Sequence, residues 1–160
     1  MKLNIGSGRQ TKSGYTNIDI VQYIDGRGRK LVDHVLDVEK QPLPFEGDSV
    51  DEILVDNVLE HLGDGLIFAL NEMHNVLKDN GQLIGMVPVA GSKEDFMDIT
   101  HKRHFIIESF SYICGENLAM ENRPYHPRYA DYGVLPWIEN KIEQKGNLIY
   151  FNLTPNKKTI

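Results

Sequence analysis

The first twenty residues hold the feature that most restricts how this chain can fold. The stretch KLNIGSGRQTKSGYTNIDI (residues 2–20) reads as a strand, a glycine-rich turn and a second strand that carries an acid, Asp19. A parallel nucleotide-binding unit begins in this order. Only residues 9–15 separate the turn from the second strand, whereas a parallel crossover usually takes a dozen or more residues and includes a helix. The sequence therefore predicts a nucleotide-binding type of sheet that lacks its first crossover helix.

Apolar patterning along the rest of the chain predicts a mixed sheet with few helices. Parallel-type strands come early and a hairpin of two alternating strands comes late, which is typical of an α/β protein. One helix has clear helical spacing, with Asp64 as its expected N-cap and the turn at residues 79–81 as its end. Besides the two opening strands, we expect strands at residues 33–38, 50–56 and 82–89, a short helix near 106–115, an irregular segment at 116–135 and the hairpin at 137–154.

Composition fits a single globular domain spanning residues 1–160. Hydrophobic residues make up 41% and charged residues 25% of the chain, which is ordinary for a globular domain. The formal net charge of -6 argues against a general nucleic-acid binder. The single cysteine, Cys114, excludes an intrachain disulfide and a multi-cysteine metal site. Because no apolar run is long enough to span a membrane and the strand-like start leaves no room for a signal peptide, we expect a cytoplasmic protein without membrane contact.

The glycine turn and Asp19 suggest a nucleoside, but not a dinucleotide. The turn contains Gly6 and Gly8, and Thr11 stands where the dinucleotide fingerprint requires a third glycine. An acid at the end of the second strand can hold both hydroxyls of a ribose. Taken alone, the same residues are also compatible with a tight structural turn followed by a solvated strand-end carboxylate.

Several segments together resemble class I S-adenosylmethionine-dependent methyltransferases. LNIGSG (residues 3–8) resembles the first glycine motif of that family, and YTNIDI (15–20) resembles its second strand with the ribose acid. Residues 34–62, with the L-P-F loop and a terminal L-E-H, and residues 70–88 resemble the stretches that follow. DITHKRHF (98–105) resembles a D-P-T-H-x-R-H-F segment of small bacterial and phage-type members. The resemblance implies a Rossmann-like mixed sheet, mostly parallel with a C-terminal antiparallel hairpin and shortened at the N-terminus.

The resemblance also implies which residues contact the cofactor, S-adenosylmethionine, and its product S-adenosylhomocysteine. The backbone around Gly6, Ser7 and Gly8 would face the methionine and ribose parts of the cofactor. Asp19 would take the ribose hydroxyls. Because S-adenosylmethionine has no diphosphate, it gains little from a helix N-terminus, and a shortened first crossover is compatible with binding it.

Three further residues carry over to the adenine and sulfonium ends of the cofactor. Asp37 would lie near the adenine amino group, with Val38 beside it, and Asn57 would lie near the sulfonium. Two positions depart from the family pattern. Asn4 stands where an acid is usual, so a charged contact toward the cofactor amino group is lost, and Gln10 stands at the usual third glycine of the loop.

Histidines after the fourth and fifth strands are the candidate catalytic residues. His61, in LEHLGD, would lie near the cofactor, where it serves as a base or packs structurally. His101 and His104 follow the fifth strand, where open α/β sheets present ligands, and a histidine there can act as a general base. Asp98 and Arg103 in the same segment are candidate acceptor-binding residues; the alternative is a loop held by its own polar contacts.

The irregular segment supplies two more candidate acceptor-binding residues, Tyr125 and Tyr129. Their neighbours His126 and Arg128 could line the same acceptor pocket, or the whole segment could be a packed flap. The weak pattern His101-x-x-His104 could also belong to a metal site, although we expect no metal.

Several functions remain compatible with these residues. The leading hypothesis is methyl transfer to O or N of a small-molecule, sugar-like or peptide-like acceptor. The alternatives are a non-catalytic binding module and a metal-dependent hydrolase that uses the His101/His104 loop. DNA is disfavoured as acceptor, because Asp56-Asn57-Val58-Leu59 lacks the proline pair of amino-methylating enzymes and Cys114 is in the wrong segment for cytosine chemistry.

The missing helices also predict an uncovered sheet face. Parallel sheets are normally covered on both faces. Either residues 116–135 fold back over the exposed strands, or a second copy of the chain covers them. We therefore expect a homodimer that pairs this face.

Overall fold

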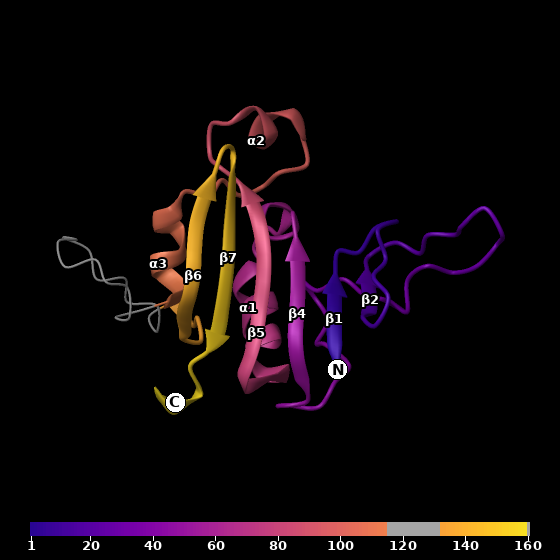
Figure 1. Ribbon diagram of the computed structural model, residues 1–160, viewed down its shortest axis with the longest axis horizontal. Helices are drawn as coiled ribbons and strands as arrows, with labels where there is room; N and C mark the ends of the chain where they lie inside the picture. Colours follow the sequence, from indigo (N-terminus) through magenta and orange to yellow (C-terminus); the bar gives the residue numbers. More distant parts are fainter. Residues whose placement is uncertain (115–131, 160) are drawn as a thin grey trace.

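The computed structural model describes residues 1–114 and 132–159, and its centre is a seven-stranded sheet (Figure 1). The β3–β2, β2–β1, β1–β4 and β4–β5 pairs are all parallel, and β7 alone runs opposite to the other strands, so that it is antiparallel to both β5 and β6. This confirms the expected mostly parallel sheet with a C-terminal antiparallel hairpin. In spatial order the strands are β3 (His34–Val35), β2 (Thr16–Asp19), β1 (Lys2–Ile5), β4 (Val50–Asp56), β5 (Leu77–Pro88), β7 (Leu148–Pro155) and β6 (Trp137–Lys145).

The helices of the described residues are short, apart from one. The longest is α1 (Leu66–Val76), which connects β4 to β5, and no described helix is long and apolar enough to cross a membrane. The others are α2 (Lys93–Met97), α3 (Ser111–Cys114) and the 3-10 turns η1 (Leu59–His61), η2 (Ile107–Phe110) and η5 (Lys157–Thr159).

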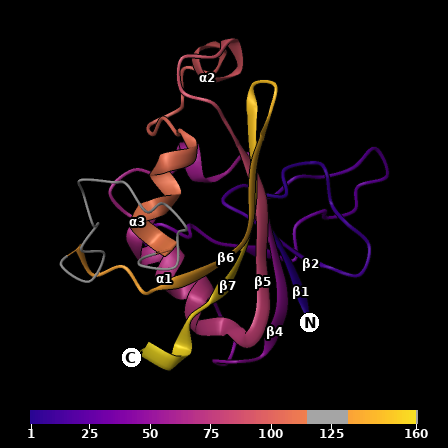
Figure 2. The same ribbon diagram turned by 60° about the vertical axis from the view of Figure 1, so that its left-hand side comes forward.

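Both α1 and α3 lie on one face of the sheet (Figure 2). The strand order means that the chain moves one way along the sheet from β1 to β2 and the opposite way from β4 to β5. Because parallel crossovers are right-handed, these two connections must cross opposite faces. The β4–β5 connection contains α1, whereas residues 6–15 of the β1–β2 connection contain no helix. The second face is therefore free of described helices, as the sequence predicts.

The covered face holds the hydrophobic core. Leu3, Ile53 and Leu83, from three neighbouring strands, are each 0% exposed, and Met73 of α1 packs into the same cluster. Trp137 closes the cluster on the β6 side and is also 0% exposed. Burying such side chains stabilises a fold by roughly 1.5–3 kcal/mol each.

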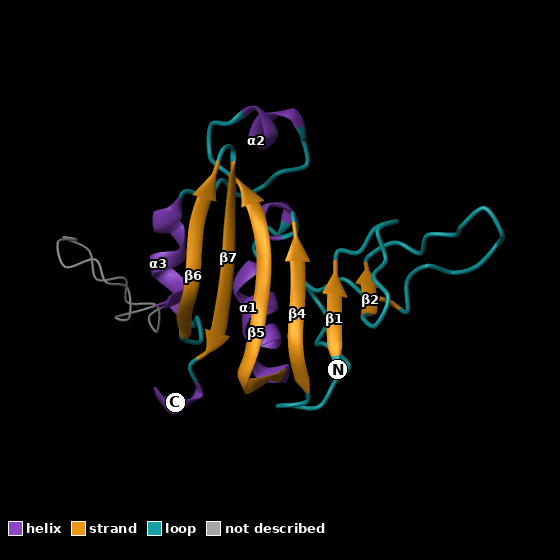
Figure 3. Cartoon of the chain, viewed as in Figure 1, coloured by secondary structure: helices purple, strands orange, loops and turns teal. Residues whose placement is uncertain are grey.

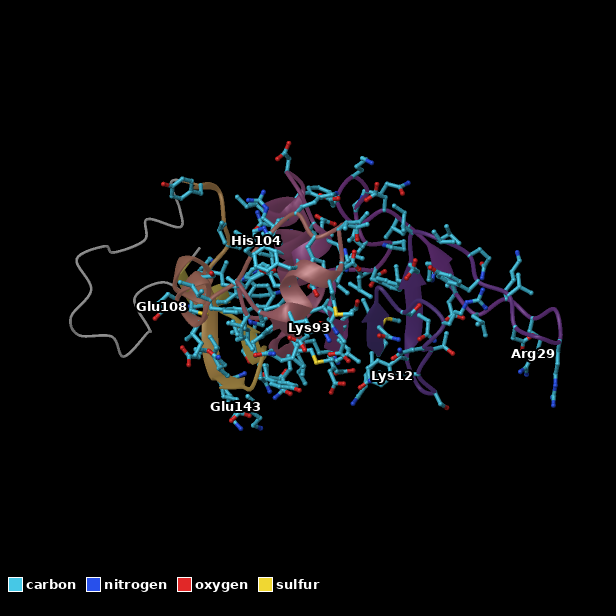
Figure 4. All side chains as sticks on the ribbon, turned by 90° about the horizontal axis from the view of Figure 1, so that it is seen from above. Lys12, Arg29, Lys93, His104, Glu108 and Glu143 are labelled. Carbon is cyan, nitrogen blue, oxygen red and sulfur yellow. The ribbon has the colours of Figure 1, made fainter. Side chains whose placement is uncertain are left out.

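The second face is mainly polar. Lys2 and Glu52 pair across β1 and β4 with Nζ and Oε2 3.0 Å apart, and the hydroxyl of Tyr15, at the end of the helix-free β1–β2 connection, donates to Glu52. Within that connection, Lys12 Nζ lies 3.8 Å from Asp56 Oδ2. Figure 4, seen from above, places Lys12 and Glu143 on this side of the sheet, opposite to His104. An extended loop thus stands where a crossover helix would lie.

Several predicted boundaries are wrong because tertiary pairing overrides local signals. Gly65, not Asp64, is the N-cap of α1, and it makes no side-chain capping hydrogen bond. The helix ends at Val76, because Leu77 pairs with Val50 at the start of β5 and is 0% exposed. Gly81 accordingly lies inside β5 and not at a helix end. The strand expected at residues 33–38 is reduced to the two residues of β3.

Candidate functional site

Two adjoining pockets open where β1, β2, β3 and β4 end. Their volumes are about 530 and 510 Å³, and Gly6, Tyr23 and Asn57 line both. Open α/β sheets bind ligands at this edge, outside the carboxyl ends of the strands. All eight residues predicted to contact a cofactor line these pockets. The first is lined by Gly6, Asp19, Asp37, Val38 and Asn57, and the second by Asn4, Gly6, Ser7, Gly8 and Asn57.

The glycine turn has a backbone that other residues would strain. Gly6 and Gly8 have φ angles of 67° and 52°, in the left-handed region that favours glycine. A Cβ on Gly6 would lie 2.4 Å from Val58 Cγ2, whereas a Cβ on Gly8 would meet nothing within 4 Å. The Gly8 N–H donates to Asp19 Oδ2 at 2.8 Å, which ties the turn to the end of β2. The open space at Gly8 leaves room for a ligand beside the turn, and the hydrogen bond to Asp19 holds the turn in place.

Buried polar side chains complete the second pocket. Ser7 is 4% exposed, and its Oγ has no hydrogen-bond partner among the described residues. Since buried hydroxyls normally find a partner, this one is available to a ligand. Asn4 Nδ2 donates to Asn17 Oδ1 at 2.9 Å and to the Gln10 carbonyl at 3.3 Å. The amide of Asn4 therefore holds the turn against β2, where the family pattern has an acid.

Asp19 and Asp37 are the two predicted cofactor contacts among the acids that line the first pocket. Asp19 Oδ1 accepts from the Val21 N–H at 3.0 Å, so each Asp19 oxygen accepts one backbone hydrogen bond and keeps capacity for another. Asp37 accepts from Lys40 Nζ at 2.7 Å and from the Glu39 N–H at 3.1 Å. The hydrogen bond from Lys40 lowers the pKa of Asp37, so its carboxyl is ionised near neutral pH. Both acids can accept hydrogen bonds from a hydroxyl or amino group.

Asn57 adopts an uncommon backbone conformation directly after β4. Its φ is 52°, and its N–H donates to the Met86 carbonyl at 2.9 Å. Among non-glycine residues, asparagine tolerates this left-handed region best. The turn redirects the chain from β4 into η1, so that His61 also reaches the first pocket.

His61 is oriented by a chain of hydrogen bonds. Its Nδ1 lies 3.0 Å from Thr100 Oγ1, which lies 2.7 Å from Asp98 Oδ1. An ionised carboxylate only accepts, so the Thr100 hydroxyl donates to Asp98 and accepts from His61 Nδ1–H. The unprotonated ring nitrogen is then Nε2. Burial, helped by the neighbouring His101, lowers the pKa of His61 and keeps the ring neutral near pH 7.

The structure brings His61 and His101 together but separates His104 from them. The His61 and His101 ring centroids are 4.7 Å apart, and His101 Nδ1 lies 2.8 Å from the Asp95 backbone carbonyl. His104 instead contacts the Asp95 carboxylate, with Nδ1 2.9 Å from Oδ1. It lines a third, more apolar pocket of about 330 Å³ on the other side of η1, together with Arg103.

The predicted acceptor-binding residues lie apart from one another. Asp98 holds Thr100, whereas Arg103 donates to the carbonyls of Leu62 at 3.4 Å and Gly63 at 2.8 Å. Tyr125, Tyr129 and their neighbours His126 and Arg128 lie outside the described residues.

Sequence reasoning missed Glu60, the residue between Leu59 and His61. Glu60 is 0% exposed, and neither carboxylate oxygen has a hydrogen-bond partner in the described part of the chain. Burial raises its pKa to about 7. The Lys102 and Arg103 N–H groups donate to its backbone carbonyl at 2.8 and 3.0 Å, which docks the 98–105 loop onto η1. The L-E-H motif contained the residue, but burial of an unpaired acid depends on contacts distant in sequence.

Known structures share this fold. The 1,6-didemethyltoxoflavin-N1-methyltransferase of Burkholderia thailandensis, crystallised with its acceptor and S-adenosylhomocysteine, aligns with 98% of this chain and 71% of its own, at 13% identity and a TM-score of 0.63. An S-adenosylmethionine-dependent methyltransferase of Archaeoglobus fulgidus aligns with 96% of this chain and 85% of its own, at 16% identity and a TM-score of 0.57. Identities this low show the fold alone.

The sequence itself carries the family assignment. No curated protein sequence gives a significant match to the chain. The family described as "Methyltransferase domain" matches residues 5–85, slightly more than half of the chain, from the glycine turn to the middle of β5. That range contains every residue predicted to contact the cofactor except Asn4. With the fold of S-adenosylmethionine-dependent methyltransferases of known structure, the chain therefore belongs to the methyltransferase domain family.

Proposed function

We propose that this chain binds S-adenosylmethionine in the two adjoining pockets and transfers its methyl group to O or N of a small-molecule, sugar-like or peptide-like acceptor. The observation that carries the proposal is the convergence of all eight predicted cofactor residues on these pockets. The pockets suit a sulfonium nucleoside: they offer a Ser7 hydroxyl without a partner among the described residues, open space at Gly8 and the carboxylates of Asp19 and Asp37.

Each side chain has a distinct part in this proposal. Asp19 accepts hydrogen bonds from the ribose hydroxyls, and Asp37 accepts one from the adenine amino group. Ser7 and the turn around Gly8 hold the methionine part. The cofactor supplies a methyl group already activated by its sulfonium, so the protein mainly aligns the reactants and excludes water.

On the acceptor side, His61 is the polar side chain where the two substrates would meet. The hydrogen-bond chain through Thr100 and Asp98 leaves its Nε2 free to accept a proton from an acceptor hydroxyl or amine. A small acceptor suits the size of the pockets, and the Burkholderia thailandensis enzyme with the same fold has a small-molecule acceptor. DNA stays disfavoured as acceptor. Cytosine chemistry needs a reactive cysteine, whereas Cys114 is 1% exposed and burial raises the pKa of its thiol to about 12.

Binding of S-adenosylhomocysteine tests the proposal directly. A ligand that binds only the folded protein, at a hundredfold excess over its Kd, adds about 2.7 kcal/mol to the unfolding free energy. A thermal melt with millimolar ligand should therefore shift upward, and calorimetry should show one site per chain. Absence of both effects would refute the cofactor assignment, whereas binding without turnover on any acceptor would leave a binding module.

The metal-dependent hydrolase that uses His101 and His104 is not favoured by the geometry. Among the described residues, the side chains grouped closely enough to hold a metal ion include His101 but not His104. Methyl transfer therefore remains the proposed activity. We also propose that the protein lies in the cytoplasm, which cell fractionation would test.

We also propose that the uncovered sheet face pairs in a homodimer. Its apolar part is a stripe formed by Leu54, Ile84 and Met86, which lie on neighbouring strands with Leu54 opposite Ile84. Around the stripe the face is polar. Light scattering across a dilution series should show twice the mass of the chain; a monomer at all concentrations would refute the dimer.

A further inference from the structure

The carboxylate of Glu60 is unpaired within the part of the protein that the structure describes. It is 0% exposed, and both of its side-chain oxygens lack a hydrogen-bond partner there. A buried carboxylate is costly unless it is paired, hydrogen-bonded or bound to a metal. The residue lies in η1, directly before His61, and its backbone carbonyl accepts hydrogen bonds from the 98–105 loop. Its surroundings therefore need a group that satisfies two oxygens at once.

Two imidazoles stand beside this carboxylate. One ligand atom from each of Glu60, His61 and His101 lies within 4.8 Å of the other two. The Nδ1 atoms of both histidines are already engaged, His61 with Thr100 Oγ1 and His101 with the Asp95 carbonyl. Within residues 1–114 and 132–159, this leaves the two Nε2 atoms as the ring nitrogens without a hydrogen-bond partner. The cluster thus combines two imidazole lone pairs with an ionisable carboxylate.

The hydrogen bonds behind the two rings have the arrangement found at metal centres. Histidines that bind metals almost always donate their other ring N–H to a carboxylate, a carbonyl or water, which fixes the tautomer and the ring orientation. His101 does so directly to a carbonyl, at 2.8 Å, and His61 does so through Thr100 to Asp98. The loop that carries Asp98, Thr100 and His101 is also held against Glu60 by backbone hydrogen bonds.

We propose that Glu60, His61 and His101 bind one divalent transition-metal ion, with Zn²⁺ as the best match. Two imidazoles and one carboxylate form a ligand set that binds zinc in several enzymes and leaves a fourth position open. Zinc holds such ligands at about 2.0–2.2 Å, which places the ligand atoms roughly 3.3 Å apart. The ligand atoms would therefore need to approach one another by up to about 1.5 Å from their 4.8 Å limit.

The open position would face the first pocket. His61 lines that pocket and is half-buried, whereas Glu60 is fully buried and the His101 side chain is only 7% exposed. An acceptor oxygen in the pocket could therefore reach the ion from the His61 side alone. With an ion bound, His61 Nε2 is a ligand and no longer a free base. The metal-loaded and metal-free proteins should then differ in their reaction with an acceptor.

Metal binding is measured without any acceptor or cofactor, so it stands apart from the proposed methyl transfer. The full chain, purified without a histidine tag and stripped with a chelator, is titrated with Zn²⁺, and with Co²⁺ as a coloured substitute. We expect one ion per chain by elemental analysis after gel filtration, and a Co²⁺ visible spectrum typical of low coordination number. Metal content below one-tenth of an ion per chain after Zn²⁺ loading, together with no such spectrum, would overturn the proposal.

Variants locate the site. Glu60→Gln keeps the size of the side chain and should weaken Zn²⁺ binding at least a hundredfold, while His104→Ala, outside the cluster, should bind Zn²⁺ like the wild type. Thr100→Val, at an exposed position, removes the hydroxyl that links His61 to Asp98 and leaves all three ligands in place, so it should weaken binding 10- to 100-fold, as outer-shell changes do. Thr100→Val tests the site even if Glu60→Gln fails to fold. Unchanged affinity in whichever of the two folds, or loss of binding in folded His104→Ala, would place the ion elsewhere.

Discussion

The two halves of the sheet are stabilised in different ways. Figure 3 shows helices beside one half and loops around the other. The half formed by β4, β5, β7 and β6 packs its covered face against α1 and α3 through large apolar side chains, among them Trp137, Phe110 and Phe151. The half formed by β1, β2 and β3 has short strands and no described helix in the connections between them. The candidate site lies at the end of this second half and at its border with the first.

In the second half, polar side chains add to the apolar packing of Leu3, Ile5 and Ile18. Asn17 links three segments: its Oδ1 accepts from Asn4 Nδ2 and from the Lys12 N–H, both at 2.9 Å, and its own N–H donates to Asp33 Oδ2 at 2.7 Å. Hydrogen bonds of this kind contribute about 1 kcal/mol each, less than a buried aromatic ring. The comparison suggests that one half supplies stability and the other supplies a polar edge for ligands. Four predictions test that division.

Truncating the core of the covered half should have the largest effect. Trp137 is 0% exposed, and Trp137→Ala leaves a large cavity, which should lower the unfolding free energy by about 3–5 kcal/mol. Ile99→Ala, at a position 96% exposed, is the matched control and should change little. Chemical denaturation measures both; a small loss for Trp137→Ala would mean that stability does not reside in this half.

Changing the polar edge should affect binding more than folding. Asp19→Ala should weaken S-adenosylhomocysteine binding by roughly 1.5–3 kcal/mol, about 10- to 150-fold, the scale of hydrogen bonds to a charged group. The variant also removes the acceptor of the Gly8 and Val21 N–H bonds, so its unfolding curve must be recorded beside the calorimetry. Asp25→Ala, in the β2–β3 connection outside both pockets, should bind normally. Equal affinity in all three proteins would remove Asp19 from the site.

A glycine-to-alanine substitution should change the unfolding free energy differently in the two halves. In Gly85→Ala of β5, the new Cβ would lie 2.2 Å from the Val55 carbonyl and 2.7 Å from Phe151 Cζ, and overpacking of this kind costs about 1–3 kcal/mol. Gly26 in the β2–β3 connection has open space and no left-handed φ. Gly26→Ala should therefore be neutral or stabilise the protein by up to about 1 kcal/mol. Similar thermal melts for both variants would contradict the division.

The smallest effect is a pH dependence that originates in the covered half. His74 of α1 is 1% exposed, and burial lowers its pKa, so the folded protein keeps this ring neutral. The unfolded chain binds the proton below about pH 6.5, so the unfolding free energy contributed by His74 is lost as the pH falls below that value. His74→Gln keeps a donor for the Pro136 carbonyl but does not titrate. Its denaturation should depend less steeply on pH between 7 and 5 than that of the wild type; parallel slopes would exclude His74 as the source.

The sequence alone determined the features that depend on local spacing. The short interval between Gly8 and Thr16 excluded a crossover helix, and the alternation around Gly146 determined the hairpin, because chain length and strand periodicity act within a few residues. Gly6 and Asp19 could be placed for the same reason, since each ends a strand whose pattern is clear. The family resemblance then extended this order to Asp37 and Asn57.

Tertiary structure alone decided the features that depend on contacts between distant segments. The helix α1 ends at Val76 because Leu77 pairs with Val50, not because of the glycine at position 81. His61 and His101 are neighbours, and His104 is not, because backbone hydrogen bonds dock the 98–105 loop onto η1. The same docking engages the Glu60 backbone carbonyl, and the Glu60 side chain is fully buried. No local pattern encodes such burial, since its energy comes from side chains that meet only once the sheet has formed.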